Sequence, residues 1–99
     1  MRVYRLETQI KINEREWIPQ GTEITNVLAI AGKDSKTDLR VAGKLSAMYG
    51  GDPAGWKKQA GKVCSDKYEF DIHWYAHDKV GQFDYKIKNF KERRGANES

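Results

Sequence analysis

The sequence predicts an α+β domain in which one main helix packs on a small antiparallel β-sheet. Residues 68–88 alternate apolar and polar side chains on both sides of a short turn, which is typical of a hairpin with one buried face. Residues 37–49 carry apolar side chains at helical spacing and end before two glycines. A strand, a helix and then a strand meander is the order expected when a helix lies on one face of a sheet.

The N-terminal part is predicted to form an arm and one buried strand. Residues 1–22 contain partly alternating apolar side chains and end in a turn with Pro19 and Gly21, so we expect a short strand or an extended arm. Residues 24–32 are rich in β-branched side chains and stop at Gly32, which predicts a buried strand.

The main helix is predicted to follow this strand. Thr37 or Ser35 can cap the helix, and Asp38 suits its positive N-terminal end. The apolar stripe consists of Leu39, Ala42, Leu45 and Met48. Gly43 weakens the helix by about 1 kcal/mol relative to alanine.

The C-terminal half is predicted to be a meander of three strands. The segments 61–65, 68–76 and 82–89 have the composition of strands joined by tight turns, and one or two N-terminal strands would complete the sheet. At 99 residues the chain is expected to form a single domain, with a core over 24–90 and a basic flexible tail over 91–99.

Strand alternation predicts one apolar and one polar face for the hairpin of residues 68–88. The polar face would carry Glu69, Asp71, His73 and Tyr75 on one strand and Asp84, Lys86 and Lys88 on the next. The apolar side chains of the two strands lie on the same face only if the numbers of two residues that pair across the hairpin add to an odd total. This condition requires a turn with an even number of residues. One allowed register pairs Asp71 with Lys86. The other pairs His73 with Lys86.

Two interpretations of this polar face remain open. It can be a solvated sheet surface, on which opposed charges contribute a few tenths to about 1 kcal/mol per pair. It can also be a site that handles phosphate, because imidazole titrates near neutral pH, tyrosine can donate a proton and lysine can hold a phosphate. Cleavage of RNA without a metal needs a base for the 2′-hydroxyl, an acid for the leaving oxygen and cations for the charged transition state.

The charge distribution suits a polyanionic partner. The chain has a formal net charge of +4 and a sequence pI near 9.2. The segment 86–94 accounts for the whole excess of positive charge, because it has five basic residues and one acid. The basic residues are Lys86, Lys88, Lys91, Arg93 and Arg94. Such a basic strand and tail can bind nucleic acid, although a solvated tail would have the same composition.

A second basic set surrounds the predicted start of the helix. It consists of Lys33, Lys36, Arg40 and Lys44. The glycine and serine of residues 31–35 would leave backbone amides free near a helix N-terminus, where anions bind. An exposed helix face would have the same composition.

Composition and spacing argue against several classes of protein. Cys64 is the only cysteine, so no intramolecular disulfide can form and we expect a reducing, cytoplasmic setting. His73 and His77 are four residues apart on or near a strand and are not held side by side as on a helix, so we expect no metal and no cofactor. No apolar run approaches the roughly 20 residues of a membrane helix, so no membrane contact is expected.

A series of short motifs resembles one family. The motifs are Gly32-Lys33, Tyr49-Gly50-Gly51, Trp56-Lys57, Gly61-Lys62, His73-Trp74 and Lys86-Ile87-Lys88. In order and spacing over residues 24–88, this pattern resembles the small C-terminal domains of phage head-morphogenesis proteins and bacterial polymorphic toxins. Those domains are assigned to the barnase, EndoU, colicin and RelE-like group of ribonucleases.

The resemblance implies a RelE/barnase-like fold that binds RNA on an open sheet face. It implies that His73 is the leading catalytic residue. It further implies phosphate-binding or transition-state roles for a set of cations, namely Lys33, Arg40, Lys86 and Lys88. A chain of this kind would be phage-borne or a toxin and would act in the cytoplasm of a bacterial host, with an immunity protein or a host protein as a further partner.

Three hypotheses follow. The first is a small metal-independent ribonuclease in which His73 is the acid or base and Tyr75 a second proton donor. In it, Lys86, Lys88 and Arg40 would hold the scissile phosphate, and the basic tail with Lys91, Arg93 and Arg94 would add salt-dependent affinity. The second is a non-catalytic module that binds nucleic acid or a host protein through the same face. The third is a structural appendage on which the charges only maintain solvation.

Overall fold

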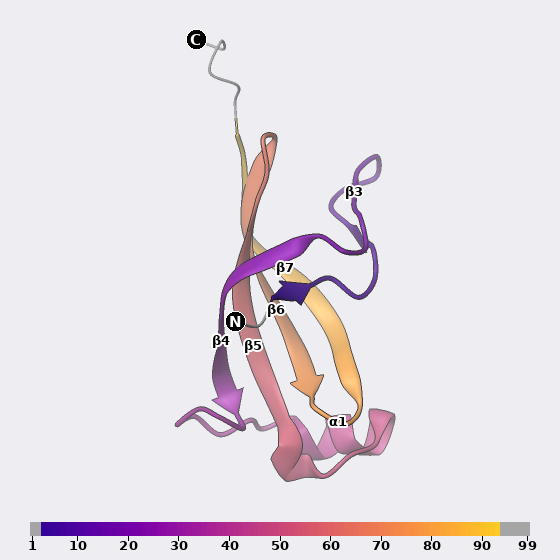
Figure 1. Ribbon diagram of the computed structural model, residues 1–99. Helices are drawn as coiled ribbons and strands as arrows, with labels where there is room; N and C mark the ends of the chain where they lie inside the picture. The colour runs from indigo at the N-terminus through magenta and orange to yellow at the C-terminus, as the bar shows by residue number, and fades with distance from the viewer. Residues whose placement is uncertain (1–2, 94–99) are drawn as a thin grey trace.

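The computed structural model describes residues 3–93, which form seven β-strands, one α-helix and one 3-10 helix. Five strands build a curled antiparallel sheet in the order β1-β4-β5-β6-β7, and two form a separate hairpin (Figure 1). The sheet strands are β1 (Tyr4–Arg5), β4 (Glu23–Gly32), β5 (Trp56–Cys64), β6 (Tyr68–His77) and β7 (Gly81–Glu92). The hairpin strands are β2 (Ile10–Lys11) and β3 (Trp17–Ile18), and the helices are α1 (Ala42–Tyr49) and η1 (Pro53–Gly55).

The architecture is mostly β, so the predicted α+β fold with one main helix on a small sheet is wrong. The helix α1 has only 8 residues and begins after Thr37, with Val41 at its N-terminal boundary and no side-chain cap. Of the predicted apolar stripe only Leu45 is buried, and Met48 is 56% exposed. The RelE/barnase-like arrangement, which needs a main helix on the sheet, is not observed. Within residues 3–93 no helix has the length and apolar character to cross a membrane.

The late start of α1 has a local cause in the loop that follows β4. The Gly32 amide donates to the Thr37 carbonyl oxygen at 2.7 Å, and the Ser35 hydroxyl lies 3.0 Å from the carbonyl oxygens of both residues. Serine and threonine here close a compact loop instead of capping a helix. Gly32 has φ +79°, and a Cβ there would overlap the Trp56 carbonyl oxygen, so glycine is required for the loop to approach β5.

The N-terminal arm, and not the helix, covers the apolar face of the sheet. The β6 side chains Phe70, Ile72 and Trp74 are almost fully buried, and they form one core cluster with Leu6 and Ile18 of the arm. Figure 1 shows α1 at the end of the sheet, beside the turn between β6 and β7. The predicted arm of residues 1–22 therefore supplies one layer of the core.

The predicted C-terminal meander is confirmed, with different limits. β5 begins at Trp56 and is longer than the segment predicted for it. β7 extends to Glu92, so the first residues of the predicted flexible tail belong to a strand. The predicted strand over 24–32 is present as β4, but most of its side chains are exposed or only partly buried rather than buried.

The hairpin of β6 and β7 combines an odd turn with a bulge. His77 pairs with Gly81, so the turn contains three residues and the predicted even length is wrong. A register shift follows at Asp84, whose φ is +59°, and beyond it His73 pairs with Lys86. Because the bulge adds one residue to β7, the numbers of residues paired beyond it add to an odd total, as the shared apolar face requires. Of the two predicted registers, the observed one is therefore the second, in which His73 pairs with Lys86.

Candidate functional site

One face of the sheet carries a row of residues from four adjacent strands. Leu28 of β4 pairs with Ala60 of β5, Ala60 pairs with His73 of β6, and His73 pairs with Lys86 of β7. Side chains of paired residues point to the same side of a sheet. We call this side the polar face, and it comprises Leu28, Lys58, Ala60, Lys62, Glu69, Asp71, His73, Tyr75, Lys86, Lys88 and Lys91.

Lysines from two strands, β5 and β7, make the polar face basic. They are Lys58, Lys62, Lys86, Lys88 and Lys91. Three adjoining hollows run along this face, and neighbouring hollows share either His73 or the pair Lys62 and Asp71. The face is therefore a continuous, shallow surface lined by ammonium groups, which attracts polyanions.

His73 lies at the centre of the polar face and has a depressed pKa. Its Nδ1 is buried, and no group within residues 3–93 forms a hydrogen bond with it. Burial lowers the pKa of the imidazole below its ordinary value of 6.5, and the charges of Lys58 and Lys88 lower it further. The Asp71 carboxylate opposes this shift with a smaller effect. The imidazole is therefore neutral at pH 7 and can accept a proton.

Tyr75 and Lys58 lie beside His73. Tyr75 follows His73 by two residues on the same side of β6, which corresponds to roughly 6.6 Å along a strand. The Lys58 ammonium lies 6.0 Å from the centre of the Tyr75 ring, a cation–π geometry. A proton acceptor, a hydroxyl donor and a cation thus share one small patch.

Two carboxylates form hydrogen bonds with other protein groups, namely Asp71 of the polar face and Asp84, which lines the hollow that contains His73. The Asn89 side-chain amide donates to Asp71 Oδ2 at 2.8 Å. The Tyr49 hydroxyl donates to Asp84, with its oxygen 3.0 and 3.2 Å from the two carboxylate oxygens, and this hydrogen bond raises the pKa of Tyr49. The acceptor capacity of these acids is partly used within the protein, which favours an anionic ligand over a cationic one.

The 3-10 helix η1 and the glycines before it close one end of the polar face. His77, which is on the same side of β6, is covered by Gly51 and Gly55, where a Cβ would overlap its ring. Trp56 packs edge-on against His77 with 5.3 Å between ring centres, and its Nε1 donates to the Gly50 carbonyl oxygen at 3.0 Å. The polar face is open along its middle and walled at this end.

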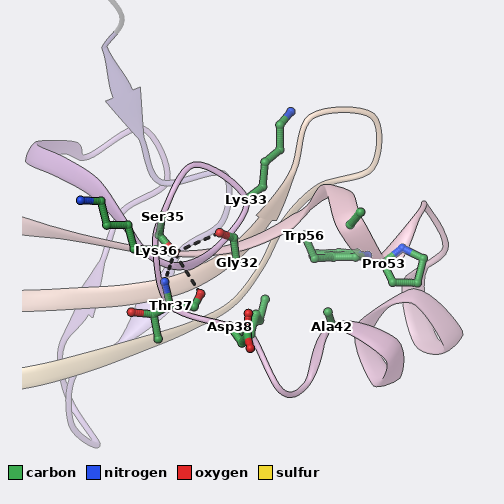
Figure 2. A pocket seen from close by; sticks show the side chains of 11 residues that line it. Gly32, Lys33, Ser35, Lys36, Thr37, Asp38, Ala42, Pro53 and Trp56 are labelled. Carbon is green, nitrogen blue, oxygen red and sulfur yellow. Dashed lines mark hydrogen bonds between the residues drawn. The ribbon is translucent and has the colours of Figure 1, made fainter.

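The predicted anion site around residues 31–35 is not formed as expected. Figure 2 shows the loop closed on itself through Ser35 and Thr37. The backbone amides of Gly32, Lys33, Ser35 and Thr37 all donate to acceptors within the protein. An anion would have to displace these hydrogen bonds to bind the four amides, and the loop ends before α1 begins at Ala42.

Two of the predicted phosphate-binding residues lie away from the polar face. The Lys33 ammonium pairs with Asp78 at 2.8 Å, and this contact raises the pKa of Lys33. Asp78 also lies 3.7 Å from the buried Lys57, so the ion pairs join the loop after β4 to the turn between β6 and β7. Arg40 is exposed in the turn before α1 and does not line the hollows that contain His73.

The remaining predicted cations have mixed positions. Lys91 belongs to the polar face, where it pairs with Glu69. Arg93 lies just beyond β7, and its guanidinium donates to the Ser65 carbonyl oxygen at 3.1 Å. Arg94 lies outside the described residues.

Sequence reasoning missed four residues of the polar face, namely Leu28, Lys58, Ala60 and Lys62. Lys58 and Ala60 were not recognised because the predicted strand began at residue 61. Lys62 lies within that predicted strand, but no pairing of the strand with the hairpin was predicted. Leu28 was expected in a buried strand, but it is 58% exposed. A bulge next to Asn26, whose φ is +54°, interrupts the alternation of β4.

The candidate site is defined by the residues of the polar face alone. Within residues 3–93, no three side chains of His, Cys, Asp or Glu gather in a way that could hold a metal ion. No family model, no curated protein and no solved structure matches the chain.

Proposed function

We propose that this protein binds RNA on its polar face and cleaves it without a metal ion, with His73 as the general base. The observation that supports this most directly is the position of His73. A neutral imidazole with a buried, unbonded nitrogen lies between Lys58 and Lys88 at the centre of a basic surface. A buried polar atom without a partner costs about 1–3 kcal/mol, and such atoms call for an explanation, of which a catalytic role is one.

The proposed step is an internal transesterification. The ribose 2′-hydroxyl gives its proton to the His73 imidazole while its oxygen attacks the adjacent phosphorus. The bond between phosphorus and the 5′-oxygen breaks, which leaves a 2′,3′-cyclic phosphate. The departing 5′-oxygen takes a proton from the Tyr75 hydroxyl, and the imidazolium and tyrosinate then exchange their proton with water.

Lysines on both neighbouring strands would hold the phosphates. Lys58 and Lys88, whose charges act on His73, are placed to balance the negative charge that develops on the scissile phosphate. Lys62 and Lys91 line the adjoining hollow and would bind a flanking phosphate. The open and shallow shape of the face suits a single strand whose bases are accessible.

A second candidate function is binding of RNA without cleavage. It is favoured by one specific observation, namely that the five lysines line the face on β5 and β7, on both sides of β6, and can bind phosphate without any contribution from His73. Single-stranded nucleic acid is commonly held by such basic surfaces through phosphate contacts and base stacking.

The test is incubation of a labelled single-stranded RNA in EDTA at neutral pH with the wild type, His73→Gln and Lys44→Ala. Lys44 is an exposed residue on α1, so its variant controls for a substitution outside the polar face. Cleavage is expected with the wild type and the control, and His73→Gln should be slower by about 100-fold or more while it still binds RNA. DNA of the same sequence should bind and stay intact, because it has no 2′-hydroxyl.

The alternative outcomes separate the two functions. RNA that binds but stays intact from about pH 5 to 9 would overturn cleavage and leave the binding function. RNA that neither binds nor breaks would overturn both.

A further inference from the structure

We propose that the hollow beside His73 is a nucleobase subsite, in which Leu28 and Ala60 contact the base whose ribose faces His73. This inference rests on the proposed function and adds to it a place for the base. It goes beyond the lysines, which bind phosphate and carry no information about the base.

The hollow has a volume of about 210 Å³ and connects three strands. It is lined by Asn26, Leu28, Ala60, Lys62, Asp71 and His73. Leu28 and His73 lie two strand spacings apart, roughly 9.5 Å, with Ala60 between them. A flat ring in van der Waals contact with a wall on each side needs about 7–8 Å, so a base fits above Ala60.

The side chains of Leu28 and Ala60 have the chemistry that a base face requires. Leu28 is 58% exposed on a face whose other side chains, apart from Ala60, are charged or polar, and it offers an apolar contact near the His73 imidazole. Ala60 extends only one methyl group, so it leaves the space between Leu28 and His73 open. A larger residue at this position would fill the hollow.

Asn26 supplies a polar group at the rim of the same hollow. It lies in the bulge of β4 with φ +54°, a conformation that asparagine tolerates better than most residues. Bulges next to functional sites redirect side chains. The Asn26 amide offers both a donor and an acceptor, which is what the edge of a nucleobase pairs with.

The experiment compares two ligands of equal charge. A hexamer of 2′-deoxyadenylate and an abasic hexamer with the same number of phosphates bind through the same lysines, and neither can be cleaved by a 2′-hydroxyl. Their dissociation constants are measured for the wild type, Leu28→Ala, Ala60→Val and Met48→Ala. Met48 is a matched control, because it is 56% exposed and lies on α1. Valine suits a strand, and circular dichroism checks that each variant is folded.

The wild type is expected to bind the adenylate hexamer about tenfold more tightly than the abasic hexamer. Leu28→Ala and Ala60→Val should lower this ratio by about fivefold and leave the affinity for the abasic hexamer unchanged, while Met48→Ala keeps the wild-type ratio. Equal binding of both ligands by the wild type, or a ratio that neither variant changes, would overturn the subsite and leave the proposed function standing. If neither ligand nor RNA binds, the proposed function fails and the subsite fails with it.

Discussion

Lys58 on β5 lies diagonally next to His73 on β6, and its ammonium charge helps to keep the pKa of the imidazole below its ordinary value. Lys88 acts in the same direction from β7, on the other side of His73. A phosphate that binds to the two lysines would neutralise their charges and so raise the pKa of His73. The imidazole would then become a stronger base at the moment when its substrate is present.

The first prediction concerns the titration of His73. In the free protein the pKa of its imidazole is expected below 6.5, Lys58→Gln should raise it, and Asp71→Asn should lower it further, because the carboxylate opposes the shift. Nuclear magnetic resonance of the ring carbons across a pH series measures these values. A pKa at or above 6.5 in the wild type would contradict the described electrostatics.

The same shift predicts the direction of a pH effect on stability. The depressed pKa means that the unfolded state binds more protons than the folded state as the pH falls through 6.5. The contribution of His73 to stability is therefore fully present above pH 6.5. It decreases as the pH falls and is lost once the pH is below the pKa of the folded state. Chemical denaturation at several pH values should show that the free energy of unfolding falls less on acidification in His73→Gln than in the wild type.

The second prediction concerns the salt dependence of RNA binding. Lys58→Gln and Lys88→Gln should each weaken binding and reduce the slope of log affinity against log salt by about 0.7, the value for one phosphate contact with a single strand. Lys44→Gln on α1 should change neither quantity. Fluorescence anisotropy titrations at several salt concentrations measure both, and equal losses in all three variants would point to unspecific attraction by net charge.

The third prediction concerns two glycines that differ in their surroundings. Gly43 lies in α1 with no atom within 4 Å of an added Cβ, so Gly43→Ala should stabilise the fold by about 0.5–1 kcal/mol. Gly32 has φ +79° and faces the Trp56 carbonyl oxygen, so Gly32→Ala should destabilise it by about 2 kcal/mol or more. Urea denaturation measures the change in the free energy of unfolding for each variant. Similar changes in the two variants would refute the close approach of this loop to β5.

The sequence predicted the hairpin well because its alternation is regular. Residues 68–76 keep a strict period of two, and the observed pairing of His73 with Lys86 was one of two allowed registers. The choice between them depended on a bulge at Asp84, whose left-handed conformation has no clear signature in the sequence. The turn length was therefore predicted wrongly, and the faces are as predicted only beyond the bulge. Phe83, expected on the apolar face, pairs with Tyr75 and lies on the side of the polar face.

The fold class was not predictable from local patterns because two tertiary contacts decide it. Helical spacing in residues 37–49 suggested a longer helix, but Ser35 and the backbone of Gly32 close a loop that delays the start of α1 to Ala42. The weakly patterned arm contributes Leu6 and Ile18 to the core, although its strands have only two residues each. Likewise, the resemblance implied a phosphate-binding or transition-state role for Arg40, but the turn before α1 leaves it outside the hollows that contain His73.

The measurement that tests the central claim most directly is a map of the RNA-binding surface by nuclear magnetic resonance. A short RNA with 2′-O-methyl groups cannot be cleaved, and it is titrated into isotopically labelled protein. We predict that amide shifts change in β5, β6 and β7 around Lys58, His73 and Lys88, and that α1 and residues 3–22 are unaffected. Changes confined to the loop of residues 32–37 or to the arm, or no changes at all, would contradict the claim that the polar face binds RNA.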